Sequence, residues 1–208
     1  MPETTLAFFA RHGTTQTNAD NCFRGNLNPD LNTEGRQDAE KLAEYFQDKD
    51  LSALFYSSRN RSTETAGIIA TKKPGIKCFG TESLWALDVG DFSGQPKDAN
   101  NQAKMDWYVA NPSVPIPGGE SLGEFKNRIR PCIMEALEIA NKSGAPVLCV
   151  VHSSVIHEVS SLFAGHHNKA LVKPGGVVEV YTENGQIHAR PILKPDVTKI
   201  GSAADTVS

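Results

Sequence analysis

Two apolar runs, far apart in the chain, constrain the fold more than any other feature of the sequence. Residues 6–10 read Leu-Ala-Phe-Phe-Ala, and residues 146–151 read Pro-Val-Leu-Cys-Val-Val. Neither run alternates with polar residues, and such runs are typical of short strands buried on both faces of a parallel sheet. A sheet built from strands of this kind needs helices on both of its faces.

The segments between and after these runs carry helical patterns. Apolar spacing predicts helices over about 32–46, 60–70 and 122–140, and a further helix directly after residues 152–154. Pro131 lies inside the third of these patterns, so we expect it to kink that helix or to divide it into two.

Two further features complete the predicted architecture. Residues 54–56 form a short strand pattern, and residues 183–185, Glu-Asn-Gly, are a hairpin turn signal between strand-like runs at 177–181 and 187–192. We therefore predict an α/β fold, a single-domain three-layer α/β/α sandwich over residues 1–194, with a mostly parallel sheet and an antiparallel edge strand. The polar tail over 195–208 is expected to be flexible.

Residues 85–119 contain many turn formers and little sustained periodicity. A long segment of this kind is more often a functional excursion over the edge of the sheet than part of the scaffold.

Composition narrows the classes of function. The chain has 208 residues and a formal net charge of -3, and it contains no long basic block, so we expect neither a nucleic-acid partner nor a membrane partner. Its 4 cysteines are widely spaced, without a Cys-x-x-Cys or Cys/His metal pattern. No leader and no apolar run of membrane-spanning length is evident, which favours a reducing cytoplasm.

Basic and imidazole groups follow three of the predicted strands. Arg11 and His12 come directly after the first apolar run, His152 follows the run at 146–151, and Arg61 lies shortly after the strand at 54–56. Because the carboxyl ends of parallel strands meet at one edge of a sheet, these side chains are expected to share one site. Guanidinium groups bind phosphate or carboxylate, and a neutral histidine can act as a base or a nucleophile.

The order of these motifs resembles the histidine phosphatase superfamily, in particular its phosphoglycerate mutase-like members. The family's opening pattern, Arg-His-Gly-x-Thr-x-x-Asn, is matched by Arg11, His12, Gly13, Thr15 and Asn18. Its second arginine falls on Arg61, its Pro-Gly-Gly-Glu-Ser element on residues 117–121, and its second histidine on His152. The resemblance covers roughly residues 6 to 190.

The resemblance implies a phosphatase that works through a phosphohistidine and needs no metal or other cofactor. His12 would be the nucleophile, Arg11 and Arg61 would hold the phosphate, and a protonated His152 would donate to its non-bridging oxygens. Thr15, Asn18 and Ser153 would add hydrogen bonds to the phosphate or the substrate, a small-molecule phosphomonoester. Ser153 stands where the family commonly has glycine.

The proton donor for the leaving oxygen departs from the family pattern. The family usually places a Glu four residues before a glycine, and this chain has Ala86 there, before Gly90. Asp88, two residues further on, is the nearest replacement, and Glu120 is the second candidate. Solvent is the third possible source of the proton.

Three functions therefore stay open at this stage. The first is phosphomonoester hydrolysis, and a good leaving group, such as that of an aryl or acyl phosphate, would tolerate a weak acid. The second is a catalytically impaired protein that binds phosphate ligands. The third is a phosphoglycerate mutase-type phosphotransferase, which needs a pocket that keeps water from its intermediate. The sequence also leaves a homodimer open.

Overall fold

A six-stranded sheet forms the centre of the molecule in the computed structural model, which describes residues 3–25, 27–163 and 173–193. The strand order is β3-β2-β4-β1-β5-β6. The strands are β1 (Thr4–Arg11), β2 (Ala53–Ser57), β3 (Cys78–Thr81), β4 (Val147–Val151), β5 (Val177–Glu183) and β6 (Gln186–Leu193). The first four run parallel, and β5 pairs antiparallel with β1 and with β6. This mixed sheet confirms the predicted fold class.

The two apolar runs are neighbours in the middle of the sheet. β1 pairs with β4 in parallel, with Phe9 opposite Cys149 and Arg11 opposite Val151. The backbone N–H of His12 continues the ladder beyond the strand, since it donates to the Val151 carbonyl at 3.0 Å. The two strands therefore end side by side, at one edge of the sheet.

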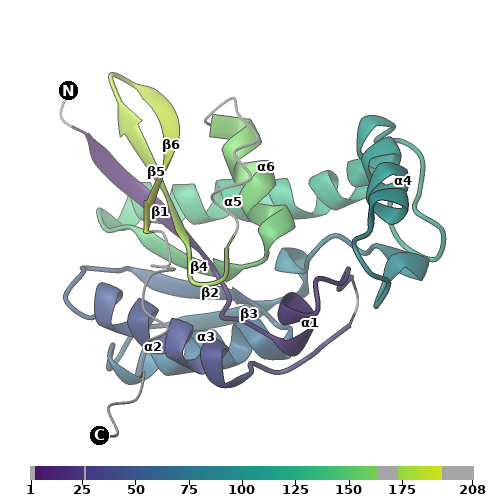
Figure 1. The fold of residues 1–208 in the computed structure, drawn as a ribbon. Helices are drawn as coiled ribbons and strands as arrows, with labels where there is room; N and C mark the ends of the chain where they lie inside the picture. Colours follow the sequence, from purple (N-terminus) through teal and green to yellow (C-terminus); the bar gives the residue numbers. More distant parts are fainter. Residues whose placement is uncertain (1–2, 26, 164–172, 194–208) are drawn as a thin grey trace, which may run out of the picture.

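Helices cover both faces of the sheet (Figure 1). On one face lie α2 (Thr33–Phe46) and α3 (Asn60–Thr71), and their apolar sides pack with Phe8, Leu54 and Leu148. On the other face lie α5 (Leu122–Ser143) and α6 (Ser153–Phe163), packed against the opposite side of β1 and β4. Because both faces are covered, the central strands carry apolar side chains in both directions, as their continuous apolar sequences require.

Local signals at the ends of the elements act as the sequence indicates. The Asn32 side chain accepts a hydrogen bond from the Gly35 N–H at 2.8 Å and caps α2. Ser121 and Glu124 form a reciprocal capping box at the start of α5. Asn184 and Gly185 both have positive φ values, 52° and 79°, as a tight two-residue hairpin requires.

Pro131 does not divide its helix. α5 is one helix of 22 residues with Pro131 inside it, so of the two expected outcomes, a kink or a division, the division is excluded. Proline removes one backbone donor and crowds the preceding turn. Ile129 and Ile133, which flank it, are both fully buried against the sheet, and this packing stabilises the continuous helix.

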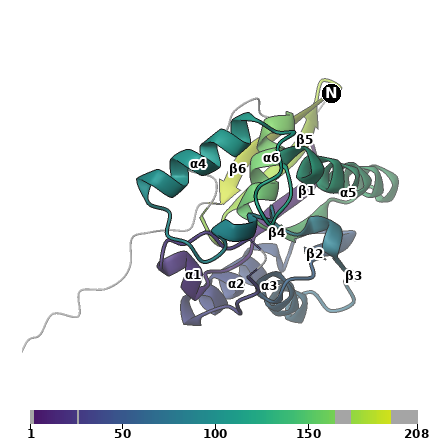
Figure 2. The same cartoon turned by 90° about the vertical axis from the view of Figure 1, so that its right-hand side faces the viewer.

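Three elements carry no clear signal in the sequence. They are the edge strand β3, the short helix α1 (Gln16–Ala19), and α4 (Ala99–Ala110), which lies within the segment that we expected to be irregular. The short 3-10 helix η1 (Glu82–Leu84) lies just before that segment, and the 3-10 helix η2 (Gly90–Phe92) lies within it. α4 lies outside the two helical layers (Figure 2). β3 is mostly exposed, and of α4 only Met105 is buried, so neither shows a sustained apolar face.

In the described part of the chain, no helix has the length and apolar character needed to cross a bilayer. The predicted tail over 195–208 lies outside the described residues.

Candidate active site

Two histidines meet where β1 and β4 end. The ring centroids of His12 and His152 are 5.2 Å apart, with an angle of 62° between the planes. Both side chains are almost fully buried, with 1% and 2% exposure. The parallel pairing of the two strands brings these residues together, as the sequence predicted.

The hydrogen bonds of His12 define its tautomer. Its Nδ1 lies 2.7 Å from the Gly13 carbonyl oxygen, and because a carbonyl only accepts, Nδ1 carries the proton. Its Nε2 accepts a hydrogen bond from Nε of Arg61 at 3.2 Å. Nε2 therefore presents a lone pair to a guanidinium group, as only a neutral imidazole can.

Arg61 is fully buried at the start of α3, directly beyond the end of β2. One of its terminal nitrogens also donates to the Leu27 carbonyl at 3.0 Å, which fixes the orientation of the guanidinium group. Thr65, one turn later, accepts from the Gly13 N–H at 3.1 Å and donates to the Arg61 carbonyl. α3 thus positions both the cation and the loop that carries His12.

Gly13 and Gly35 form a close backbone contact beneath the site. An added Cβ at Gly13 would lie 2.1 Å from the Gly35 oxygen, and one at Gly35 would lie 1.9 Å from the Thr14 oxygen. No side chain fits at either position, so the start of α2 packs directly on the loop after β1. Asp38 of α2 accepts from both the N–H and the hydroxyl of Thr14 and fastens the same loop.

Burial and neighbouring positive charges lower the pKa values of the arginines in this site. Burial, with the nearby Arg24 and Arg61, lowers the pKa of Arg11 to about 9. Burial, with Arg24 and Arg59, also lowers the pKa of Arg61 to about 9. Nε of Arg11 is buried and has no hydrogen-bond partner among the described residues. Cations held in this way would be stabilised by an anion.

The same surroundings keep both imidazoles neutral. Burial, and then Arg61, lowers the pKa of His12 and that of His152 well below the usual value for histidine. For His12 this agrees with the expectation of a neutral ring. For His152 it corrects the expectation of a protonated ring, because burial and four neighbouring guanidinium groups disfavour a further positive charge.

The structure adds cations that sequence analysis missed. Arg24 and Lys97 come from loops far apart in the chain, which a short backbone ladder joins: Cys22 pairs with Pro96, and the Lys97 N–H donates to the Asn21 carbonyl at 3.0 Å. Burial and the neighbouring Arg24 lower the pKa of Lys97 to about 8. A single cation in an irregular loop gives no periodic signal, so only the pairing of the loops reveals this contribution.

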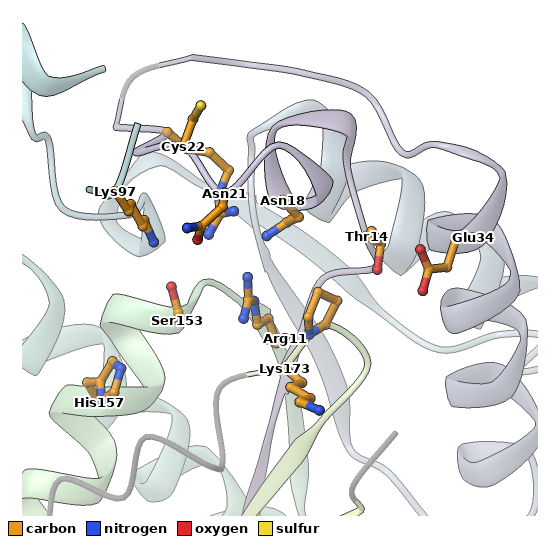
Figure 3. Close-up of a pocket in the computed structure, with 12 residues that line it drawn as sticks. Arg11, Thr14, Asn18, Asn21, Cys22, Glu34, Lys97, Ser153, His157 and Lys173 are labelled. Atoms are coloured by element: carbon orange, nitrogen blue, oxygen red, sulfur yellow. The ribbon is translucent and has the colours of Figure 1, made fainter. Parts of the chain in front are cut away.

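Two adjoining cavities open over the strand ends. The outer cavity, of about 600 Å³, is lined by Arg11, Asn18 and Ser153 among others (Figure 3). The inner cavity, of about 160 Å³, is lined by His12, Arg61 and His152 together with apolar side chains. Arg24, Lys97 and Ser153 line both. The residues predicted from three strand ends therefore converge on one cavity system.

Thr15 takes a structural role in this arrangement. It is fully buried, and its backbone N–H and hydroxyl both donate to Oδ1 of Asn18, at 3.1 and 2.8 Å. Asn18 lines the outer cavity, so Thr15 supports a residue that faces the cavity and does not itself line either one.

The two candidate acids lie behind the segment that contains Ala86. Ala86 lines the inner cavity, whereas Asp88 and Glu120 line neither cavity. A carboxylate oxygen of Asp88 accepts from the Gly90 N–H at 3.0 Å. Glu120 accepts from the Asp88 N–H at 2.9 Å and forms an ion pair with Arg128 at 2.6 Å. Arg128 also donates to the backbone carbonyls of residues 82, 83, 85 and 86, so both carboxylates are engaged in holding this segment in place.

The fold and the site together define an α/β protein with a cationic pocket built around two buried histidines. The chain belongs to the histidine phosphatase superfamily (branch 1), whose family model matches residues 7–190.

Its relatives include both mutases and phosphatases. Phosphoglycerate mutase-like protein 4 of Arabidopsis thaliana is 32% identical over 156 residues, which are 72% of this chain and 66% of the relative. The 2,3-bisphosphoglycerate-dependent phosphoglycerate mutase of Methylorubrum populi is 26% identical over 205 residues, 92% of this chain and 97% of the relative. The solved structure of a mycobacterial glucosyl-3-phosphoglycerate phosphatase complexed with VO3 has the same fold, with a TM-score of 0.72 and 21% identity over 92% of this chain and 98% of that one.

Proposed function

We propose that this protein is a phosphatase that hydrolyses phosphomonoesters through a phosphohistidine intermediate on His12. The observation that carries the proposal is the hydrogen bond from Nε of Arg61 to Nε2 of a neutral, buried His12, within a pocket of cations. Arg11 and Arg61 would bind the phosphoryl oxygens and stabilise the charge that develops on them in the transition state.

The reaction takes two steps. In the first, the lone pair on Nε2 of His12 forms a bond to phosphorus, and the bond from phosphorus to the leaving oxygen breaks. In the second, water attacks the phosphohistidine and releases inorganic phosphate. Splitting the transfer in this way is ordinary covalent catalysis, and the chain's own residues suffice for it.

His152 assists as a hydrogen-bond donor to the phosphoryl group. Its Nε2 lies 2.7 Å from the Ser57 hydroxyl, whereas its Nδ1 is buried and has no partner among the described residues. A dianion bound beside it would favour a proton on the ring, because the added negative charge offsets the neighbouring guanidinium groups.

The leaving oxygen takes its proton from water in this proposal. Ala86 carries no acid, and the carboxylates of Asp88 and Glu120 accept hydrogen bonds from the backbone of the same segment. If Asp88 were the donor, Asp88→Asn would slow the hydrolysis of alkyl phosphates more than that of p-nitrophenyl phosphate. Glu120→Gln gives the same test for Glu120, and equal effects on both substrates support water.

The proposed activity is tested with p-nitrophenyl phosphate. We expect His12→Ala to lower kcat by about a thousandfold or more, since it removes the nucleophile. His188→Ala, on the edge strand β6, is the matched control and is expected to keep full activity. Rapid quenching with labelled substrate should trap an acid-labile phosphoenzyme in the wild type and in the control, but not in His12→Ala.

The alternatives predict other results. A protein that only binds phosphate ligands would bind vanadate without any turnover. A mutase would transfer the phosphoryl group to a second substrate, so inorganic phosphate would appear more slowly than the dephosphorylated product. We propose that the protein acts in the cytoplasm and that its substrates are small molecules. Detection of the protein in fractions of the cell would test the location.

A further inference from the structure

The inner cavity has an apolar wall next to its reactive side chains. Besides His12, Arg61 and His152, it is lined by six apolar residues, which are Phe23, Ala86, Leu87, Val89, Met105 and Val109. They come from three separate parts of the chain: the loop after α1, the segment between η1 and η2, and α4. Apolar side chains donate no hydrogen bonds to a phosphoryl group, so this wall is available to the other half of a substrate.

This wall is part of a small packed unit. Phe23, Val89 and Met105 are buried together with Ile116, and Phe92 packs against them. The Phe23 and Phe92 rings meet edge to face at 5.8 Å. The Leu87 N–H donates to the Ser154 hydroxyl at 3.1 Å, which ties the unit to the start of α6 and hence to the strand end that carries His152. The apolar wall is therefore preformed, at a fixed place relative to the histidines.

The two adjoining cavities have room for a phosphoryl group and one aromatic ring together. The inner cavity has a volume of about 160 Å³, and it shares Arg24, Lys97 and Ser153 with the outer cavity of about 600 Å³. Val109 lines the inner cavity although its side chain is 47% exposed, so the wall reaches the solvent-facing side of α4.

The cavity also lacks an acid. None of the described residues that line it is an aspartate or a glutamate. Without a carboxylic acid beside the leaving oxygen, bond cleavage is fast only when that oxygen is a stable anion. A phenol such as the tyrosine side chain has a pKa of about 10, whereas an aliphatic alcohol is a much weaker acid and its anion a poorer leaving group. Both the shape and the chemistry of the cavity favour a phenolic leaving group over an aliphatic one.

We infer that the substrate class of this site is the aryl phosphates, phosphomonoesters of small phenols whose ring lies against Phe23, Leu87, Met105 and Val109. The inference rests on the proposed phosphatase function. In the first step the Nε2–phosphorus bond forms, and the phosphorus–oxygen bond to the ring breaks. Its electron pair leaves with the phenolate, which takes a proton from water. In the second step water adds to phosphorus, the electron pair of the nitrogen–phosphorus bond returns to Nε2, and phosphate is released.

Binding of the ring is tested without turnover. The dissociation constants of phenylphosphonate and 2-hydroxyethylphosphonate are measured by calorimetry. The two ligands share a phosphonate group, which carries an aromatic ring in the first and a short polar chain in the second. We expect phenylphosphonate to bind at least tenfold more tightly. Val109→Asn should raise the dissociation constant of phenylphosphonate about fivefold, because apolar contact area is lost. It should leave the dissociation constant of 2-hydroxyethylphosphonate unchanged. Val114→Asn, at a half-buried valine that lines neither cavity, is the matched control and should change neither constant.

Hydrolysis tests the leaving group. We expect kcat/KM to fall in the order phenyl phosphate, benzyl phosphate, glycerol phosphate, because benzyl phosphate keeps the ring but has an aliphatic leaving oxygen. Comparison of kcat/KM for phenyl phosphate and for free phosphotyrosine shows whether the site prefers a bare phenol or one that carries an amino-acid chain. Equal dissociation constants for the two phosphonates, or equal kcat/KM for phenyl and glycerol phosphates, would overturn the inference while the phosphatase function stands. Selective binding of phenylphosphonate without hydrolysis of any ester would instead refute the phosphatase function and keep the ring site.

Discussion

Acidification should destabilise this protein through its two central histidines. Burial and nearby guanidinium groups lower the pKa of His12 and that of His152 in the folded state. In the unfolded chain a histidine has a pKa of about 6.5. Between these values the unfolded chain binds protons that the folded protein does not. The stability is therefore fully present above pH 6.5, and it is lost as the pH falls below that value.

The size of the effect follows from proton linkage. From pH 7.5 to pH 5.5, a histidine that stays neutral in the folded state loses about 1.4 kcal/mol of unfolding free energy, because its unfolded form gains about one proton. For both histidines together the loss is about 2.7 kcal/mol. Such a change is a large part of the stability of an ordinary domain.

The assay is urea unfolding at pH 7.5, 6.5 and 5.5 in a buffer without phosphate. Wild type is compared with two variants, His12→Gln and His152→Gln. Each variant replaces one of the two histidines by a residue that does not titrate. All three proteins share the contributions of carboxylates, so the difference between their pH profiles isolates each histidine. Each variant should lose about 1.4 kcal/mol less than the wild type over this range. Parallel profiles for wild type and variants would refute the argument that these rings are buried and neutral.

Three further predictions follow from the contacts of the site. Gly13→Ala should cost about 3 kcal/mol or more in urea unfolding, because its Cβ would lie 2.1 Å from the Gly35 oxygen. Gly67→Ala on α3, with nothing within 4 Å of the added Cβ, should stabilise by up to about 1 kcal/mol, and equal effects of the two would contradict the close contact. Arg24→Gln should weaken inhibition by vanadate about tenfold, whereas Arg36→Gln, at an exposed arginine paired with Glu64, should not; an unchanged constant for Arg24→Gln would remove Arg24 from the site. Ala86→Glu should raise kcat for alkyl phosphates about tenfold or more and change that for p-nitrophenyl phosphate little, since an acid at this position would line the inner cavity; the same change for both substrates would show that the new group does not protonate the leaving oxygen.

The scaffold could be predicted from the sequence because its signals are local. The continuous apolar runs that became β1 and β4 identify buried strands, and parallel pairing then brings their ends together without further information. His12 and His152 follow these strands directly, so their meeting was predictable from position alone. Arg61 was predictable for the same reason, since it lies in the first turn of the helix after β2.

Elements that are stabilised only by long-range contacts were missed. α4 buries little more than Met105, and β3 is an exposed edge strand that is held by its pairing with β2. Pro131 favours a break when the helix is considered alone, but burial of the flanking isoleucines outweighs this local preference. In each case tertiary packing decided what the local sequence left open or indicated wrongly.

The sequence by itself determined the α/β architecture and the two histidines and two arginines of the motif, because each of these depends on residues adjacent in the chain. Only the tertiary structure decided the rest of the site. The pairing of two distant loops adds Arg24 and Lys97, and packing of three separate segments builds the apolar wall of the inner cavity. The protonation of His152 likewise depends on cations contributed by other segments, so no local pattern records it. The charge and the shape of this pocket depend on residues that lie far apart in the chain. These residues come together only in the folded protein, so no local stretch of sequence predicts their combined effect.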